Sequence, residues 1–272
     1  GADGDAIRNA FIAGSEIAYV LAETCGHGHY FHGWWSTVTF GLVGATAAAG
    51  AICGLTEDQM AAALGLAAAA AGGSKAVFGS NAKPFLVGDT ARRAIGFARM
   101  AGAGLTGPEQ GFEGGTGFFK LMNNGSADES MVATLGVQWR LVEPGLLFKT
   151  NPVCSAAQAA IDQMAALMAE TGALPHEIVE IIAEVPELVD ISLIHPDPHT
   201  PQEAQFSLPY ALACTALHGR VQFDDLLPDA IRTPDKTALM AKVRVERAAD
   251  LSTDAMRAAC PARRRMVRST AW

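Results

Sequence analysis

Charged residues are scarce in this chain of 272 residues, because Asp, Glu, Lys and Arg together make up 18% of it. The balance is also acidic, since 28 acidic residues against 20 basic ones give a formal net charge of −8. Such a chain lacks the basic surface that attracts a phosphate backbone, so we predict no nucleic-acid partner. Its main basic cluster, formed by Arg263, Arg264, Arg265 and Arg268, is interpreted as a solvated tail.

Cysteine is also sparse, and no Cys-x-x-Cys pair occurs among Cys25, Cys53, Cys154, Cys214 and Cys260. This scatter predicts reduced thiols and hence a cytoplasmic location. The stretch GADGDAIRNAF lacks the basic and apolar regions of a signal peptide. Val38–Leu55 carries no charge, but its Gly, Ala and Thr favour a buried helix, so we predict no membrane association.

One stretch, Gly26–Gly54, combines two kinds of sequence. Its first part, up to Ser36, packs histidines, aromatics and glycines into a loop, which is typical of a ligand pocket. Its second part is small and apolar, and predicts a helix that is buried on every side. A helix N-terminus presents free backbone N–H groups, so we expect a pocket for a negatively charged ligand at this junction.

The rest of the chain predicts a mainly α protein with a large all-helical domain, residues 1–145, and a smaller α+β domain, residues 146–272. A capping box at Thr56–Gln59 marks one helix start, and Gly72–Val87 is expected to be a loop. Helices are predicted at Asp5–Cys25, Thr37–Ile52, Thr56–Ala71, Ala91–Ala103, Ser155–Glu170 and Thr200–Leu217. Strands are predicted at Val179–Val185 and Lys242–Glu246, with Val179, Ile181, Ala183 and Val185 on the buried face.

Three histidines, His27, His29 and His32, have a spacing that a metal site could use. No group of Cys or carboxylate ligands completes a set within the loop, so we predict no metal; capping, hydrogen bonding or anion binding is the alternative. A nucleophilic pair between Cys25 and a loop histidine lacks an orienting partner and is the weaker hypothesis.

Two lysines stand in apolar segments next to a proline. Lys83 directly precedes Pro84, which predicts an extended backbone there. Lys149 lies in Leu147–Pro152. For both residues the alternative to a site lysine is an ordinary lysine whose stem lies along apolar surface.

Several motifs together resemble the MmgE/PrpD family, in its order and spacing, over most of the chain. They are GHGHYFHGWWSTVTFGLVGATAAAGAICGL, NAKPFLVGDTARRA, LTGPEQGFEGGTGFF, FKTNPVC and PQEAQFSLPYALACTALHGRV. The resemblance implies a helical domain with an α+β domain, a homodimer and no cofactor. It also implies proton transfer next to a carboxylate of a small di- or tricarboxylate, as in dehydratases, decarboxylases and epimerases.

By the resemblance, Lys83 and Lys149 match the family's site lysines and would bind carboxylates or stabilise an enolate-like intermediate. His29, Tyr30, Trp35 and Ser36 would line the same substrate site. Trp35 stands where the family's G-W-H-S-T pattern has a histidine, and Trp exchanges no proton at neutral pH. His32, or else His29, is therefore the candidate proton carrier.

The resemblance also implies that the helical domain lacks its N-terminal part, with an Asp-rich motif and an HP motif, and that the α+β domain lacks its C-terminal part. The leading hypothesis is a cofactor-independent lyase or isomerase. The alternatives are a truncated, inactive family member that binds carboxylates or only oligomerises, and a metal hydrolase that uses the histidine cluster.

Overall fold

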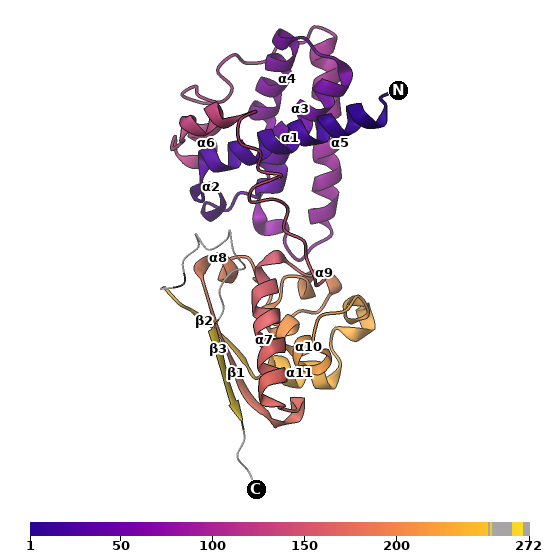
Figure 1. The fold of residues 1–272 in the computed structure, drawn as a ribbon, viewed down its shortest axis with the longest axis vertical. Coiled ribbons are helices and arrows are strands. Elements are labelled where there is room, and N and C mark those ends of the chain that lie inside the picture. The colour runs from indigo at the N-terminus through magenta and orange to yellow at the C-terminus, as the bar shows by residue number, and fades with distance from the viewer. Residues whose placement is uncertain (250, 252–262, 269–272) are drawn as a thin grey trace. The chain divides into compact units, whose positions relative to one another are not determined.

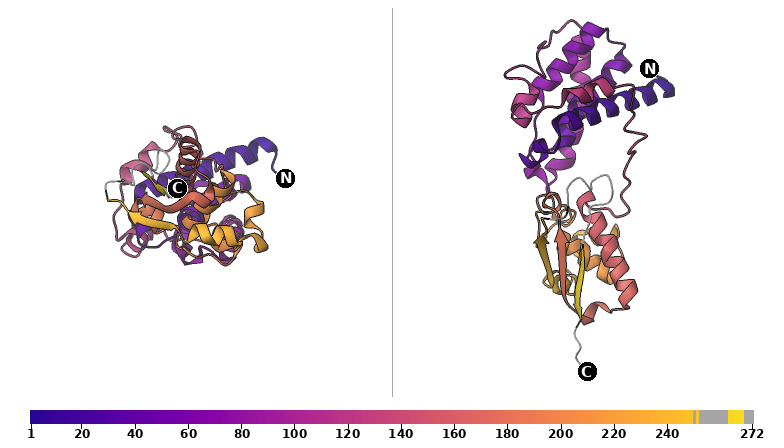
Figure 2. Two further views of the ribbon diagram at one scale, coloured as in Figure 1. Left: turned by 90° about the horizontal axis from the view of Figure 1, so that it is seen from below. Right: turned by 60° about the vertical axis from the view of Figure 1, so that its left-hand side comes forward.

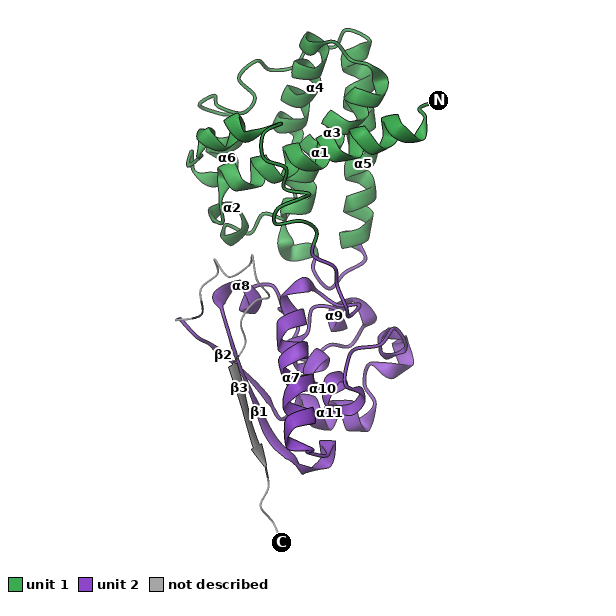
Figure 3. Cartoon of the chain, viewed as in Figure 1, with its two compact units in different colours: residues 1–77, 82–146 green, residues 78–81, 147–272 purple. Residues whose placement is uncertain are grey.

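The computed structural model describes residues 1–249, 251 and 263–268, and it confirms the predicted mainly helical fold (Figure 1). The chain divides into two compact units (Figure 3). Unit 1 comprises Gly1–Val77 and Ala82–Leu146, and unit 2 comprises Phe78–Asn81 and Leu147–Trp272. The short segment Phe78–Asn81 thus belongs to unit 2, although unit 1 precedes and follows it along the chain.

Unit 1 is built around α3, which packs against α1, α4 and α5 (Figure 1). Its core joins apolar side chains such as Leu42, Phe40 and Phe118. Of the helices in the described ranges, α3 alone has the length and hydropathy to cross a membrane. Buried core helices commonly have the same length and hydropathy. The elements are α1 (Gly4–Cys25), α2 (Gly28–Phe31), α3 (Ser36–Cys53), α4 (Glu57–Ala70), η1 (Lys75–Val77), α5 (Ala82–Gly102), α6 (Phe118–Asn123) and η2 (Glu129–Thr134).

Two glycines let α1 and α3 cross at close range. A Cβ atom added to Gly14 would lie 2.5 Å from the carbonyl oxygen of Gly44 and 2.8 Å from the Cβ of Ala48. A Cβ added to Gly44 would collide in turn with the carbonyl oxygen of Gly14. The crossing therefore depends on the absence of side chains at both positions.

Local sequence signals, such as capping residues, predict most helix boundaries of unit 1 correctly. The capping box is present, with the Thr56 hydroxyl accepting from the Gln59 N–H and the Gln59 side chain accepting from the Thr56 N–H. The prediction for Lys83 was wrong, because α5 begins at Ala82 and Lys83 lies in its first turn. A proline is tolerated in a first turn, where its missing N–H has no partner to lose, so Pro84 does not stop this helix.

Unit 2 combines a small sheet with helices. The strand order is β2-β1-β3, with β2 parallel and β3 antiparallel to β1. Figures 1 and 2 show α7 and α10 on one side of this sheet, where α10 contacts β2 and α7 contacts β3. The elements are η3 (Ser155–Ala157), α7 (Gln158–Thr171), η4 (Pro175–Glu177), β1 (Ile178–Val185), α8 (Glu187–Asp190), α9 (Pro201–Ala204), α10 (Leu208–His218), η5 (Asp224–Leu226), η6 (Pro228–Ala230), α11 (Pro234–Met240), β2 (Val243–Arg247) and β3 (Arg263–Arg268).

Two predictions in unit 2 need correction. The single helix expected at Thr200–Leu217 is two helices, because Ser207 leaves the helical conformation and its side chain caps α10. In β1, Val179 is exposed and Ile182 is buried, so the strict alternation predicted there is wrong. Ile181, Ile182 and Ala183 are all buried, so side chains that point to both faces of β1 are shielded from solvent here.

Each unit buries an ion pair. In unit 1, Glu16 accepts the backbone N–H of Arg140 at 2.8 and 2.9 Å, and Arg140 also contacts Glu23. In unit 2, the Lys236 ammonium lies 2.8 Å from the Asp225 carboxylate. Burial alone would raise the pKa of Asp225. The hydrogen bonds from Lys236 and the Gln222 N–H, together with the charges of Lys236 and His218, instead lower this pKa below its ordinary value of 3.8.

Candidate functional site

The loop before α3 is held by a second loop that lies forty residues further along the chain. The Trp35 N–H donates to the Gly73 carbonyl at 2.9 Å, and the Lys75 N–H donates to the Gly33 carbonyl at 2.9 Å. Gly73 has a φ of +146°, and a Cβ atom there would collide with Val38 at the start of α3. This pairing brings Lys75 to the junction of α2 and α3.

Two lysine–aromatic contacts lie at this junction. The Lys75 Nζ is 3.7 Å from the centre of the Tyr30 ring, and the Lys83 Nζ is 4.9 Å from the centre of the Trp35 ring. Both distances are within the range of cation–π attraction. We call these four residues the lysine–aromatic cluster. Burial removes water from the Lys75 ammonium and lowers its pKa. An anionic neighbour would stabilise this poorly hydrated charge.

The N-terminus of α3 lies beside this cluster. Trp35 is the N-cap residue, and Ser36 is the first residue of the helix. In the described part of the chain, no side-chain hydrogen bond caps this terminus. The partial positive charge of the terminus adds to the charges of Lys75 and Lys83, so the junction suits a carboxylate. The Trp35 side chain is buried, with 4% of its surface exposed, and forms a wall of the cluster rather than a proton carrier.

His29 lies behind the cluster and is completely buried. Its Nε2 is 3.0 Å from the Thr39 hydroxyl, and its ring is 4.2 Å from the Phe40 ring. Its Nδ1 has no hydrogen-bond partner among the described residues. Burial, followed by the charges of His32 and Lys75, lowers the pKa of His29 to about 4. At neutral pH His29 is therefore an uncharged imidazole with an unused polar atom.

His32 differs from His29 in its surroundings. It is exposed at the C-terminal end of α2, and its Nε2 is 3.3 Å from Asn124 Nδ2. Its charge acts on His29, so the two rings are electrostatic neighbours. Within the residues that the structure describes, no group of three or more His, Cys, Asp or Glu side chains could hold a metal ion.

Lys149 belongs to unit 2, whereas the lysine–aromatic cluster comprises residues of unit 1. Lys149 is exposed, as is the preceding Phe148. The residues that follow are held firmly, because Gln158 accepts from the Asn151 N–H and the Asn151 side chain accepts from the Val221 N–H. Lys149 is thus an exposed side chain two residues before the hydrogen-bonded Asn151.

Sequence reasoning missed Lys75 and Thr39. Lys75 follows Gly72 and Gly73, which is the signal that could have marked it, because glycines permit a close backbone pairing. Thr39 gives no such signal, since it stands one turn into an apolar helix and matters only through its contact with His29.

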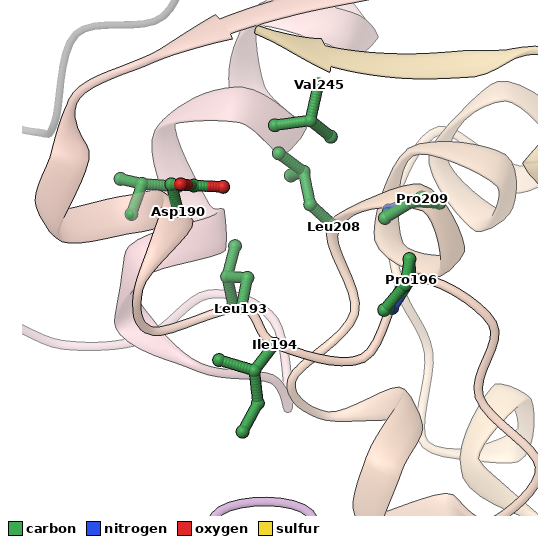
Figure 4. Close-up of a pocket in the computed structure, with 8 residues that line it drawn as sticks. Asp190, Leu193, Ile194, Pro196, Leu208, Pro209 and Val245 are labelled. Atoms are coloured by element: carbon green, nitrogen blue, oxygen red, sulfur yellow. The ribbon is translucent and has the colours of Figure 1, made fainter. Parts of the chain in front are cut away.

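Unit 2 contains an apolar pocket of about 200 Å³ (Figure 4). Figure 4 shows Leu193, Leu208 and Val245 at its walls, with Asp190 at its edge. The Asp190 carboxylate is paired with Arg247 at 2.6 Å. An apolar wall with a single, paired acid does not suit a polycarboxylate, so this pocket is not the candidate site.

Comparison with known protein families identifies the chain's relatives. The profile of the MmgE/PrpD N-terminal domain matches residues 1–130, and that of the MmgE/PrpD C-terminal domain matches residues 152–271. The chain belongs to the MmgE/PrpD family, as its motifs predict.

Among curated proteins, it is similar to the cis-aconitate decarboxylases of Homo sapiens and Mus musculus, with 26% identity to each. The matched regions cover 76% and 77% of this chain, and 43% and 44% of the human and mouse proteins. The chain therefore spans less than half the length of these relatives.

Proposed function

We propose that this protein is a cofactor-independent lyase or isomerase that acts on a small di- or tricarboxylate by proton transfer next to a carboxylate. The observation that carries the proposal is the pair Lys75 and Lys83, held over Tyr30 and Trp35 at the N-terminus of α3. The similarity to cis-aconitate decarboxylases supports the substrate class.

The chemistry needs positive charge at fixed positions. Removing a proton next to a carboxylate puts further negative charge on an anionic substrate, whereas loss of carbon dioxide moves the charge of a carboxylate onto the carbon atom that held it. Cations and N–H groups that are already in place stabilise this charge without reorganising. In this proposal Lys75 and Lys83 bind two carboxylates, and Ser36 offers its hydroxyl at the helix terminus.

The remaining predicted site residues take assigned roles. The family motif makes Lys149 a further candidate for carboxylate binding, and Tyr30 and Trp35 shape the wall of the lysine–aromatic cluster. His29 accepts a hydrogen bond or a proton through its imidazole, and exposed His32 exchanges protons with solvent. Residues 1–145 and 146–272 act as the helical and the α+β domain of a cytoplasmic homodimer.

A second function, carboxylate binding without turnover, is favoured by two observations. Trp35 holds the place of a family histidine and is buried under Lys83. His29 has a pKa of about 4 and holds almost no proton at neutral pH, so it cannot replace a general acid there.

Proton NMR in D₂O separates these functions. The protein is incubated with cis-aconitate, citrate, 2-methylcitrate and succinate, and the carbon-bound protons next to the carboxylates are followed. The enzyme function is supported if the protein consumes a substrate or exchanges these protons, if Lys83→Ala abolishes this activity, and if Lys120→Ala retains it. Lys120 is a suitable control because it is exposed on α6.

Binding without any exchange, lost in Lys83→Ala, supports the carboxylate-binding function. If the folded protein shows neither binding nor exchange, both functions are contradicted. Light scattering tests the homodimer separately, and a stable monomer contradicts it.

A further inference from the structure

The imidazole of His29 is held by side chains of unit 1 alone. Its ring centre lies 4.2 Å from that of Phe40 and 6.4 Å from that of Trp34, and its Nε2 lies 3.0 Å from the Thr39 hydroxyl. The aromatic rings restrict the orientation of the imidazole without contacting a nitrogen through a polar atom. Among the described residues, Thr39 is therefore the polar partner of the ring nitrogens.

Two arrangements of protons fit these contacts. A neutral imidazole carries one proton, on Nε2 or on Nδ1, and its hydrogen bonds decide which. With the proton on Nε2, His29 donates to the Thr39 oxygen. The Thr39 hydroxyl then donates to the carbonyls of Trp35 and Ser36, each at 3.4 Å. With the proton on Nδ1, the Thr39 hydroxyl donates to Nε2, and a buried N–H has no acceptor among the described residues.

The first arrangement makes more hydrogen bonds and leaves no N–H without a partner. A threonine inside a helix can donate back to the carbonyl four residues earlier, which for Thr39 is Trp35. Buried N–H groups without an acceptor are rare in folded proteins. Burial, followed by the charges of His32 and Lys75, lowers the pKa of His29, so the ring carries one proton at neutral pH. One nitrogen is then unprotonated, and the hydrogen bonds favour Nδ1.

We propose that Thr39 is a positioning residue that fixes His29 as the Nε2–H tautomer and so makes Nδ1 the basic nitrogen of the site. Thr39 itself contacts no substrate in this proposal. The inference rests on the proposed function, in which His29 accepts a hydrogen bond or a proton. It specifies the accepting atom, whose matched partner is a hydrogen-bond donor. An ionised carboxylate offers no proton to Nδ1, so carboxylate binding is left to Lys75 and Lys83.

The test reads the tautomer of His29 in the full chain without a substrate. Long-range ¹H–¹⁵N correlation NMR of protein labelled at its seven histidines gives the shifts of both ring nitrogens, which differ strongly between protonated and unprotonated nitrogen. The signals of His29 are those missing in His29→Gln. They also belong to a ring that stays neutral down to about pH 5, because the pKa of His29 is about 4. We expect Nε2 to be protonated and Nδ1 to be unprotonated.

Threonine variants of α3 test the role of the hydroxyl. Thr39→Val removes the hydroxyl and keeps the shape of the side chain, so we expect the ratio of the two tautomers to change by about fivefold, as for one lost hydrogen bond. Thr39→Ser keeps a hydroxyl and should retain the wild-type ratio. Thr46→Val is the matched control, because Thr46 is buried in the same helix and its hydroxyl donates to the Leu42 carbonyl at 2.7 Å. This control should also retain the wild-type ratio.

A wild-type His29 that is protonated on Nδ1 overturns the inference. An unchanged ratio in folded Thr39→Val overturns it too, and so does an equal change in Thr46→Val. Thr39→Ala replaces Thr39→Val, with the same expected result, if the valine variant does not fold. The exchange measurement in D₂O tests the proposed function separately. If the wild type neither binds nor converts a polycarboxylate, the proposed function fails, and the tautomer of His29 still decides whether Thr39 fixes it.

Discussion

Replacing Gly44 with alanine should destabilise unit 1, although glycine-to-alanine changes usually stabilise helices. In the middle of α3 the change gains up to about 1 kcal/mol in helix propensity. However, the new methyl group would collide with the Gly14 carbonyl of α1 and lie 2.8 Å from the Ala18 Cβ. Overpacking of this kind costs typically about 1–3 kcal/mol, and a backbone carbonyl cannot move aside as a side chain does.

Gly41 provides the matched control in the same helix. A Cβ atom at Gly41 meets no atom of the described residues within 4 Å. Gly41→Ala should therefore show the propensity gain alone and stabilise the helix by about 0.5–1 kcal/mol. Gly44→Ala should show a net loss of about 2 kcal/mol, since forcing α1 and α3 apart also weakens neighbouring contacts.

Urea denaturation followed by tryptophan fluorescence measures this difference. Trp34, Trp35 and Trp139, three of the four tryptophans, belong to unit 1, so the signal follows that unit. With a slope of about 2 kcal/mol per M, the midpoint should fall by about 1 M for Gly44→Ala and rise by a few tenths for Gly41→Ala. If Gly44→Ala proves as stable as Gly41→Ala, the close crossing of α1 and α3 is refuted.

Three further predictions concern buried ionisable side chains. Arg140→Met keeps the backbone N–H that Glu16 accepts but removes the guanidinium, so Glu16 stays buried without a countercharge. Unit 1 should lose about 3 kcal/mol of unfolding free energy in urea denaturation, and adding Glu16→Gln should recover part of this loss. The folded pKa of Asp225 lies below 3.8. The ionised Asp225 carboxylate therefore stabilises the fold above pH 3.8, and this contribution is lost as the pH falls through the folded pKa. Acid unfolding of Asp225→Asn should lack this loss of stability. The folded pKa of His29, about 4, lies below its ordinary 6.5, so only the unfolded chain gains a proton between these values. Stability should fall by up to about 3 kcal/mol from pH 6.5 to 4, and urea midpoints of His29→Leu that show the same fall would contradict this account.

The parts of the fold that the sequence predicts are those with local causes. Gly26 ends α1 and the Thr56–Gln59 box starts α4 because caps act on the nearest backbone groups. The segment Val179–Val185 predicts a strand through its β-branched residues between Glu180 and Glu184, although its alternation is not strict. The start of α5 was not predictable in this way, since the local preference against helix before Pro84 is overridden by packing of the whole helix against α3.

In the candidate site, too, the sequence predicts only the features that have local causes. Lys83 and the loop before α3 stand out in the sequence through their composition, and the structure places Lys83 against Trp35. Lys75 does not stand out, because its position depends on backbone pairing between Gly33–Trp35 and Gly73–Lys75, which no local pattern encodes. The unused Nδ1 of His29 is likewise a property of burial, which composition does not reveal for one residue.

The segment Phe78–Asn81, whose Phe78 ring stacks on the Phe206 ring, has a consequence for exchanging domains between relatives. Phe78–Asn81 lies within the region matched by the N-terminal profile, yet it completes unit 2. A chimaera joined between residues 130 and 152 would give unit 2 a foreign version of this segment. Phe206 would then lose its stacking partner, and His195 would face a residue other than Gly79. Matching residues 78–81 to the donor of unit 2 should decide whether such a chimaera folds.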